Sequence, residues 1–278
     1  MTMQSVAETR LRRPLVPRVQ TYLDELVRTC AEIGQPLVSV ILFGSAASGG
    51  FSNASDVDLI IVVPDETTPE GKRALRTEVA RLEILQGFRP PHARQAVQAR
   101  IERAVGHLFS CFICTRGDLI SGNVARILDL RPWEAPFVDR IVLSSIVASA
   151  ETAWGEDVLP GVQVPPVRRL DVFKALFGFS SQVVLSIGTF PVLPDATKYA
   201  MGVLKHSLHS CFFCYHRRTA GLEEEVDFFG RRLGGCRTLE ELLSLRREYR
   251  RSIGFVIRCL PTLARLHLRT ARDNQFAN

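Results

Sequence analysis

The chain has 278 residues, of which 46% are hydrophobic and 23% charged, and its formal net charge is +6. This balance is typical of a folded globular protein of one large or two smaller domains, and it excludes a disordered or low-complexity chain. Residues 1–13 are polar and end in arginines, so we expect no signal peptide, a cytoplasmic location and no membrane partner.

The first elements are a helix, a strand, a loop and a second strand. Apolar residues recur at helical spacing over 15–33, and the β-branched run Val38–Phe43 predicts a buried strand. Glycine, serine and asparagine then dominate as far as Ser55, which indicates a loop. Strand composition returns at Asp56–Val63.

Two carboxylates begin this second strand. Asp56 and Asp58 are two residues apart, so both side chains point to one face of the strand, while Val57 points to the other. Adjacent carboxylates repel each other unless a cation lies between them, and open oxygen sites suit Mg²⁺. The preceding Gly44 and Ser45 offer close backbone approach, N–H groups and a hydroxyl, which are suited to a phosphate.

Gly44-Ser45, ten residues and then Asp56-Val57-Asp58 resemble the signature of the DNA polymerase beta-like nucleotidyltransferases. The string GSAASGGFSNASDVDL is most similar to small bacterial members, including the aminoglycoside adenylyltransferases. The resemblance implies that Asp56 and Asp58 are catalytic and hold Mg²⁺, and that Gly44, Ser45 and Ser55 bind the nucleoside triphosphate. The alternative is a plain hairpin whose aspartates keep its end soluble.

The next elements complete an α/β (α+β) half with a short mixed sheet. We predict helices over Gly71–Leu85, His92–Val105 and Asp118–Leu128, with a third strand at His107–Cys114. The apolar run Val138–Ala150 fits either helix or strand. Ala153–Leu159 resembles the segment that closes the catalytic domain in this family, and a proline-rich linker follows at Pro160–Pro166.

The third strand lacks a residue that the resemblance leads us to expect. Family members usually supply a third acid from this strand, as metal ligand or general base, but His107–Cys114 contains none. Three explanations stay open: Glu102 enters the site, His107 is the catalytic base, or the enzyme is impaired.

The seven cysteines include two CxxC pairs, Cys111 with Cys114 and Cys211 with Cys214. Such pairs can hold zinc, but the residues between them are bulky and apolar. An odd number of cysteines also suggests reduced thiols. We therefore predict core cysteines in place of a zinc site.

The second half has helical periodicity throughout, which predicts a bundle. We expect helices over Asp171–Ile187, Asp195–Thr219, Leu222–Leu233 and Thr238–Arg272, the last with a break at Pro261. The domain prediction is a nucleotidyltransferase domain over 1–160 and a C-terminal helical bundle over 168–278.

Two features of the bundle are candidate binding residues. Lys198 and Lys205 lie on one helical face with His209, and the resemblance implies that a basic residue of this domain contacts the triphosphate. The acidic run Glu223–Glu225 suits a cationic acceptor such as an aminoglycoside, although an acidic helix N-terminus explains it equally well.

Residues 231–278 hold eleven arginines and four acidic residues, so this segment carries the excess of positive charge. The arginines either bind RNA or form a solvated helix face.

The leading hypothesis is an Mg²⁺-dependent enzyme that moves a nucleoside monophosphate from ATP or another nucleoside triphosphate to an acceptor hydroxyl, on a small, antibiotic-like molecule. The alternatives are an RNA- or protein-modifying nucleotidyltransferase of the toxin–antitoxin type and a catalytically degenerate module that binds nucleotide.

Overall fold

The structure is a computed structural model that describes residues 14–44, 47, 57–88, 111–130 and 138–276. The chain forms two compact units that interleave along the sequence. The described residues up to Phe88, 111–130 and Ser149–Pro165 belong to the first unit, and the second takes 138–148 and the chain from Pro166 onward.

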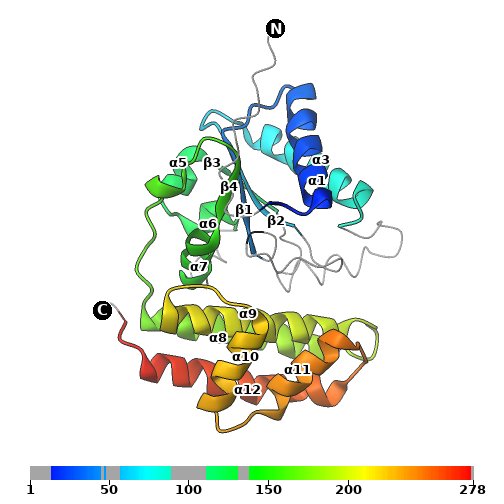
Figure 1. Ribbon diagram of the computed structural model, residues 1–278, viewed down its shortest axis with the longest axis vertical. Coiled ribbons are helices and arrows are strands. Elements are labelled where there is room, and N and C mark those ends of the chain that lie inside the picture. Colours follow the sequence, from blue (N-terminus) through cyan, green and yellow to red (C-terminus); the bar gives the residue numbers. More distant parts are fainter. Residues whose placement is uncertain (1–13, 45–46, 48–56, 89–110, 131–137, 277–278) are drawn as a thin grey trace. The chain divides into compact units, whose positions relative to one another are not determined.

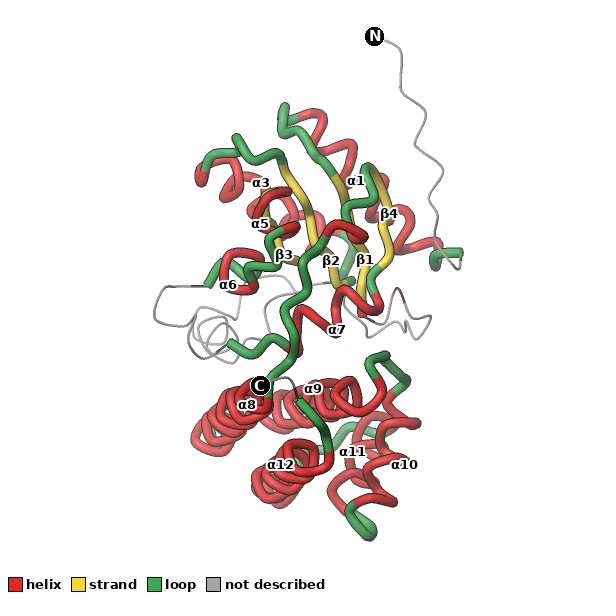
Figure 2. Tube along the Cα trace, turned by 90° about the vertical axis from the view of Figure 1, so that its left-hand side faces the viewer, coloured by secondary structure: helices red, strands yellow, loops and turns green. Residues whose placement is uncertain are grey.

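The first unit contains a four-stranded mixed sheet. Its strands are β1 (Ser39–Phe43), β2 (Asp58–Val63), β3 (Cys111–Thr115) and β4 (Glu151–Gly155), which lie side by side in the order β3-β2-β1-β4 (Figure 2). β1 pairs antiparallel with β2 and β4, while β2 and β3 are parallel. A parallel pair needs a long crossover connection, which here includes the helix α3 (Pro69–Leu85).

One face of the sheet packs against α3 and α1 (Pro17–Glu32), which lie together in Figure 1. Both helices start with proline in the first turn, where its missing N–H costs nothing. Apolar residues at three- and four-residue spacing cover the strands and form one core with them: Val19, Tyr22, Leu26, Leu75, Val79 and Leu82 from the helices, and Val40, Leu42, Leu59, Ile61 and Ile113 from the strands. The predictions of both helices and three strands are confirmed in the described residues.

The predicted helix Asp118–Leu128 is wrong as one element. The structure has two short helices, α5 (Arg116–Ile120) and α6 (Val124–Ile127). Gly122 separates them with a φ of +63°, and a Cβ there would lie 1.8 Å from the carbonyl oxygen of Gln163. Asn123 then caps α6 by accepting a hydrogen bond from the backbone N–H of Arg126.

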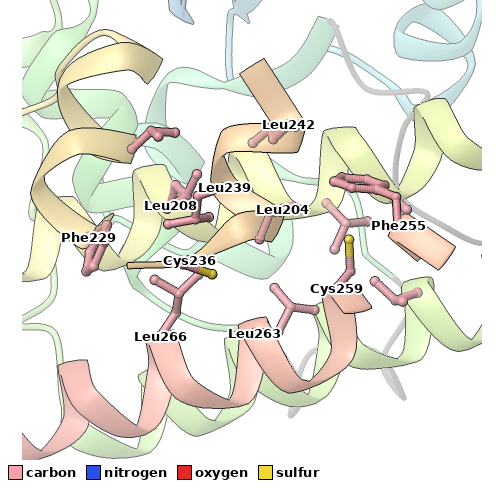
Figure 3. Close-up of a cluster of buried hydrophobic side chains, with 14 of the residues drawn as sticks. Leu204, Leu208, Phe229, Cys236, Leu239, Leu242, Phe255, Cys259, Leu263 and Leu266 are labelled. Atoms are coloured by element: carbon pink, nitrogen blue, oxygen red, sulfur yellow. The ribbon is translucent and has the colours of Figure 1, made fainter. Parts of the chain in front are cut away.

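The second unit is helical, as predicted, with α8 (Arg169–Thr189), α9 (Ala196–His216), α10 (Leu222–Arg232), α11 (Arg237–Arg247) and α12 (Ile253–Asp273). The ambiguous apolar run is the helix α7 (Ile141–Ser149), whose Ile141 packs against α8 and α9. Figure 3 shows the main core, where Leu204 and Leu208 of α9 meet leucines and aromatic residues of α10, α11 and α12. The fold class, a mixed α/β unit followed by helices, is confirmed.

The last predicted helix, Thr238–Arg272, breaks at a different place. Ser252 begins α12 by accepting a hydrogen bond from the backbone N–H of Phe255, and its own N–H donates to Thr197 Oγ1. Pro261, where we expected the break, lies inside α12 on its exposed side. Water can solvate the backbone carbonyl that proline leaves without a donor there, so the helix continues.

All seven cysteines are free, and of the two CxxC pairs only Cys111 is partly exposed. Cys114, Cys211 and Cys214 are buried, and burial raises the pKa of the Cys114 and Cys211 thiols to about 12. These cysteines are therefore protonated core residues at neutral pH, in agreement with the sequence prediction.

α8 is long and apolar enough to cross a membrane by length and composition alone. In the second unit it packs against α9 and α12, with Val172, Ala175 and Val183 buried. Only 28% of its apolar stretch is buried here, but a single helix of this length and composition also occurs in helical bundles, so α8 by itself does not indicate a membrane protein.

Candidate active site

The candidate site lies where β1 ends and β2 begins. Phe43, the last residue of β1, pairs with Asp58, the first residue of β2. Gly44 follows Phe43, so the antiparallel register alone brings the glycine and the carboxylate to the same end of the sheet. Asp58 is half-buried.

The two faces of β2 have different surroundings. Val57 is 2% exposed and belongs to the core under α1 and α3. Side chains alternate along a strand, so Asp58 projects from the opposite face, which it shares with Phe43 and Ile60. The prediction that Val57 and Asp58 face opposite ways is confirmed.

Gly44 lies in direct contact with the Asp58 carboxylate. It has a φ of +67°, a conformation that other residues rarely adopt. A Cβ on Gly44 would lie 2.2 Å from Asp58 Oδ2 and 3.1 Å from Asp58 Cγ. The carboxylate therefore rests directly against the bare Cα of Gly44, in a space that any side chain would fill.

The described strands hold one other carboxylate, Glu151 of β4, which does not join Asp58. Glu151 pairs with Leu42, whose side chain faces α1 and α3, so it lies on the opposite face of the sheet. The described part of β3, Cys111–Thr115, contains no acid, as its sequence shows. Asp56, Ser45, Ser55, Glu102 and His107 lie outside the described residues, so their assignments stay predictions.

Comparison with protein families identifies this part of the chain. Residues 23–108 match the model of the nucleotidyltransferase domain family, and the match includes Gly44 and Asp58. The chain therefore carries a nucleotidyltransferase domain. This confirms the resemblance to the DNA polymerase beta-like nucleotidyltransferases and the enzyme class.

Most of the chain also resembles a solved adenyltransferase structure in fold. That structure is spectinomycin adenyltransferase AAD(9) from Enterococcus faecialis with ATP and spectinomycin, and it has a TM-score of 0.51. The likeness covers 91% of this chain and 98% of that chain at 11% sequence identity, so it shows a shared fold. No curated protein sequence matches the chain.

The helical unit places the two candidate lysines in different surroundings. Lys198 Nζ lies 2.8 Å from Asp195 Oδ1 and 4.9 Å from the centre of the Tyr249 ring. Lys205 is half-buried, and its charge partly opposes burial, which raises the pKa of the Glu225 carboxyl. Both lysines lie on one side of α9, as the spacing predicts, and their role in nucleotide binding stays a prediction.

The acidic run of α10 divides into exposed and buried residues. Glu223 and Glu224 are exposed and form ion pairs with Arg247 and Arg218. Glu225 is fully buried, and its Oε1 lies 2.5 Å from His209 Nδ1. Burial is the largest influence on its carboxyl and raises its pKa. The acidic run was visible in the sequence, but this buried pair was not.

Several of the C-terminal arginines contact carboxylates or backbone carbonyls within the helical unit. Arg232 and Arg269 contact Asp273, Arg258 contacts Glu241, and Arg265 donates to the Leu233 carbonyl. These contacts agree with the solvated-surface interpretation, and nothing in the comparisons supports RNA binding.

The Gly44–Asp58 contact gives a prediction with a matched control in the same unit. Gly34 has almost the same φ, +68°, but a Cβ there would meet no atom of the described residues within 4 Å. Alanine at either position should cost about 1–2 kcal/mol of stability for the left-handed conformation. Gly44→Ala should also displace the Asp58 carboxylate and lower nucleotidyl transfer by about 10²-fold, the effect of a displacement near 1 Å.

Steady-state kinetics and urea unfolding of both variants test this prediction. Gly34→Ala should lose stability and keep its activity. Equal activity of the two variants would show that the contact with Asp58 does not matter for the reaction.

Proposed function

We propose that the protein is an Mg²⁺-dependent nucleotidyltransferase that transfers a nucleoside monophosphate to a hydroxyl of a small, antibiotic-like molecule in the cytoplasm. The observation that carries the proposal is the Asp58 carboxylate held against Gly44 within the matched nucleotidyltransferase domain. The shared fold with an adenyltransferase solved with ATP and spectinomycin supports a small-molecule acceptor. Seven free cysteines are consistent with a reducing compartment.

The residues present fit a divalent cation. Asp58 supplies a hard oxygen ligand that lies against Gly44, and the resemblance adds Asp56. Oxygen ligands with room for water and phosphate oxygens suit Mg²⁺. When bound, the metal would neutralise charge on the phosphates.

In this reaction the acceptor oxygen forms a bond to the α-phosphorus, and the bond from that phosphorus to the β-phosphate oxygen breaks. Pyrophosphate leaves, and the hydroxyl proton passes to a base. The protein contributes mainly position and charge, because phosphoryl transfer needs little covalent chemistry from side chains. Glu102 and His107 remain our candidates for the base.

A labelling screen tests the proposal. The protein is incubated with ATP or GTP labelled at the α-phosphate and with spectinomycin, other aminoglycosides, lincosamides, bulk tRNA or no acceptor. We expect label on a small molecule, and we expect Asp58→Asn to abolish it. Label on tRNA or on the protein itself would contradict the small-molecule acceptor.

A second function, nucleotide binding without catalysis, is favoured by one observation. β3 is the neighbour of β2, the strand that carries Asp58, and its described residues include no carboxylate. The same screen separates the two functions, because tight nucleotide binding without transfer to any acceptor would support the binding module.

A further inference from the structure

An aromatic pair lies across β2 on the face that carries Asp58. Phe43 of β1 pairs with Asp58, and Phe112 of β3 pairs with Ile60, so both rings project from the same face as the carboxylate. Their ring centres are 6.0 Å apart with an interplanar angle of 17°, which is a stacked arrangement. Phe43 is 9% exposed and Phe112 is half-buried.

The stack connects two strands that are not neighbours. β1 and β3 lie on opposite sides of β2, so their backbones are separated by about 10 Å, two strand spacings. The two rings reach toward each other over β2 and close this gap beside Asp58. Offset aromatic pairs of this kind contribute about 0.5–1.5 kcal/mol beyond the area that they bury.

The stack acts on the part of β1 that contacts Asp58. Phe43 is covalently followed by Gly44, whose Cα has no side chain between it and the Asp58 carboxylate. Phe43 is also the direct cross-strand neighbour of Asp58, a pair whose Cβ atoms are about 4.5–5.5 Å apart. A shift of Phe43 at the end of β1 would therefore move Gly44, against which the carboxylate rests.

We infer that Phe112 is a positioning residue for the metal-binding carboxylate, acting through Phe43 and Gly44. This inference rests on the proposed function, because it assumes that Asp58 binds a divalent cation. Phe112 fixes the end of β1 against Asp58, so that the carboxylate is oriented before the metal and the nucleotide arrive. Residues that orient metal ligands typically contribute 10- to 100-fold to metal affinity.

The sequence suggests no such role for Phe112, because an aromatic residue in an apolar strand is most simply explained by core packing. Phe88 is the matched control. It is 9% exposed and packs on the opposite face of the sheet, edge to face with Tyr22 at 5.3 Å. Removing either ring should destabilise the first unit, but only Phe112 lies on the face with Asp58.

The experiment measures Mn²⁺ binding by electron paramagnetic resonance and Mn²⁺-dependent ATP binding by calorimetry, beside urea unfolding. Phe112→Ala should weaken Mn²⁺ binding about 10-fold or more, while Phe88→Ala should lose stability and keep wild-type affinity. Phe112→Tyr, which retains the ring, should bind like the wild type. Phe112→Leu keeps apolar volume without a planar ring, and it should show the loss of affinity if Phe112→Ala does not fold.

The outcomes separate this inference from the proposed function. If the wild type and Asp58→Asn bind Mn²⁺ equally, the metal site itself is wrong. If Asp58→Asn loses binding while the Phe112 variants match the wild type and Phe88→Ala, the metal site stands and Phe112 is only a packing residue.

Discussion

Asp58→Asn is expected to abolish nucleotidyl transfer without unfolding the protein. Asparagine has the shape of aspartate and fits against Gly44, but it lacks the negative charge that a divalent cation requires. Loss of one preorganised electrostatic contact in an active site costs about 10²- to 10³-fold in rate. Because Asp58 is also a candidate metal ligand, we expect Mg²⁺-dependent ATP binding to disappear, and we expect the same of the double variant Asp56→Ala, Asp58→Ala.

Calorimetry with ATP and Mg²⁺, together with the labelling screen, measures both effects. Glu151→Gln is the control, since Glu151 is the other carboxylate of the described strands and lies on the opposite face of the sheet. That variant should bind and react normally. Unchanged binding in Asp58→Asn would overturn the assignment of the metal site.

His209→Ala is expected to destabilise the helical unit by about 3–5 kcal/mol, the cost of leaving a buried charge without its partner. Glu225 is fully buried, and its Oε2 has no hydrogen-bond partner among the described residues, so His209 Nδ1 is the main compensation for its charge. The pKa of Glu225 is raised in the folded state, and its ordinary value is 4.5. The loss should therefore shrink as the pH falls below 4.5, where Glu225 is protonated in both the folded and the unfolded state, and grow as the pH rises through the folded pKa.

Urea unfolding followed by far-ultraviolet circular dichroism, which reports mainly on the helices, gives the free energies. Asp227→Ala is the control, because it removes an exposed ion pair with Arg231 and should change stability by less than about 1 kcal/mol. Adding Glu225→Leu to His209→Ala should recover most of the loss, since apolar residues often replace a buried ion pair without cost. A small, pH-independent effect of His209→Ala would mean that Glu225 does not depend on the histidine.

Much of the fold could be predicted because the hydrophobic periodicity is strong. The apolar, β-branched runs Val38–Phe43 and Asp56–Val63 on either side of a glycine-rich loop predicted both strands. The two-residue spacing of Asp56 and Asp58 predicted that Asp58 and Val57 project from opposite faces. The helices of the bundle followed from three- and four-residue spacing. Their ends were harder to predict, because the break before α12 depends on a hydrogen bond between Ser252 and Thr197, which are far apart in sequence.

The candidate site was predictable only where its chemistry is local. Gly44 and Asp58 form a motif, so their types and spacing indicated the function directly. The roles that depend on packing could not be found this way: Phe112 meets Phe43 only across β2, and Glu225 is buried only because α10 packs against α9. An acidic run at a helix N-terminus has the same sequence whether its third residue is exposed or buried.

Gly44 and Asp58 lie at the adjoining ends of the antiparallel strands β1 and β2, and this position affects the order in which the protein folds. Gly44 and Asp58 are close in sequence, so bringing them together closes a short loop at a small entropic cost. β3 and β4 join the sheet from residues much further along the chain, and such non-local pairings form slowly. The contact between glycine and carboxylate can thus form in the nascent β1–β2 hairpin, before the aromatic residue from β3 arrives to hold it in place.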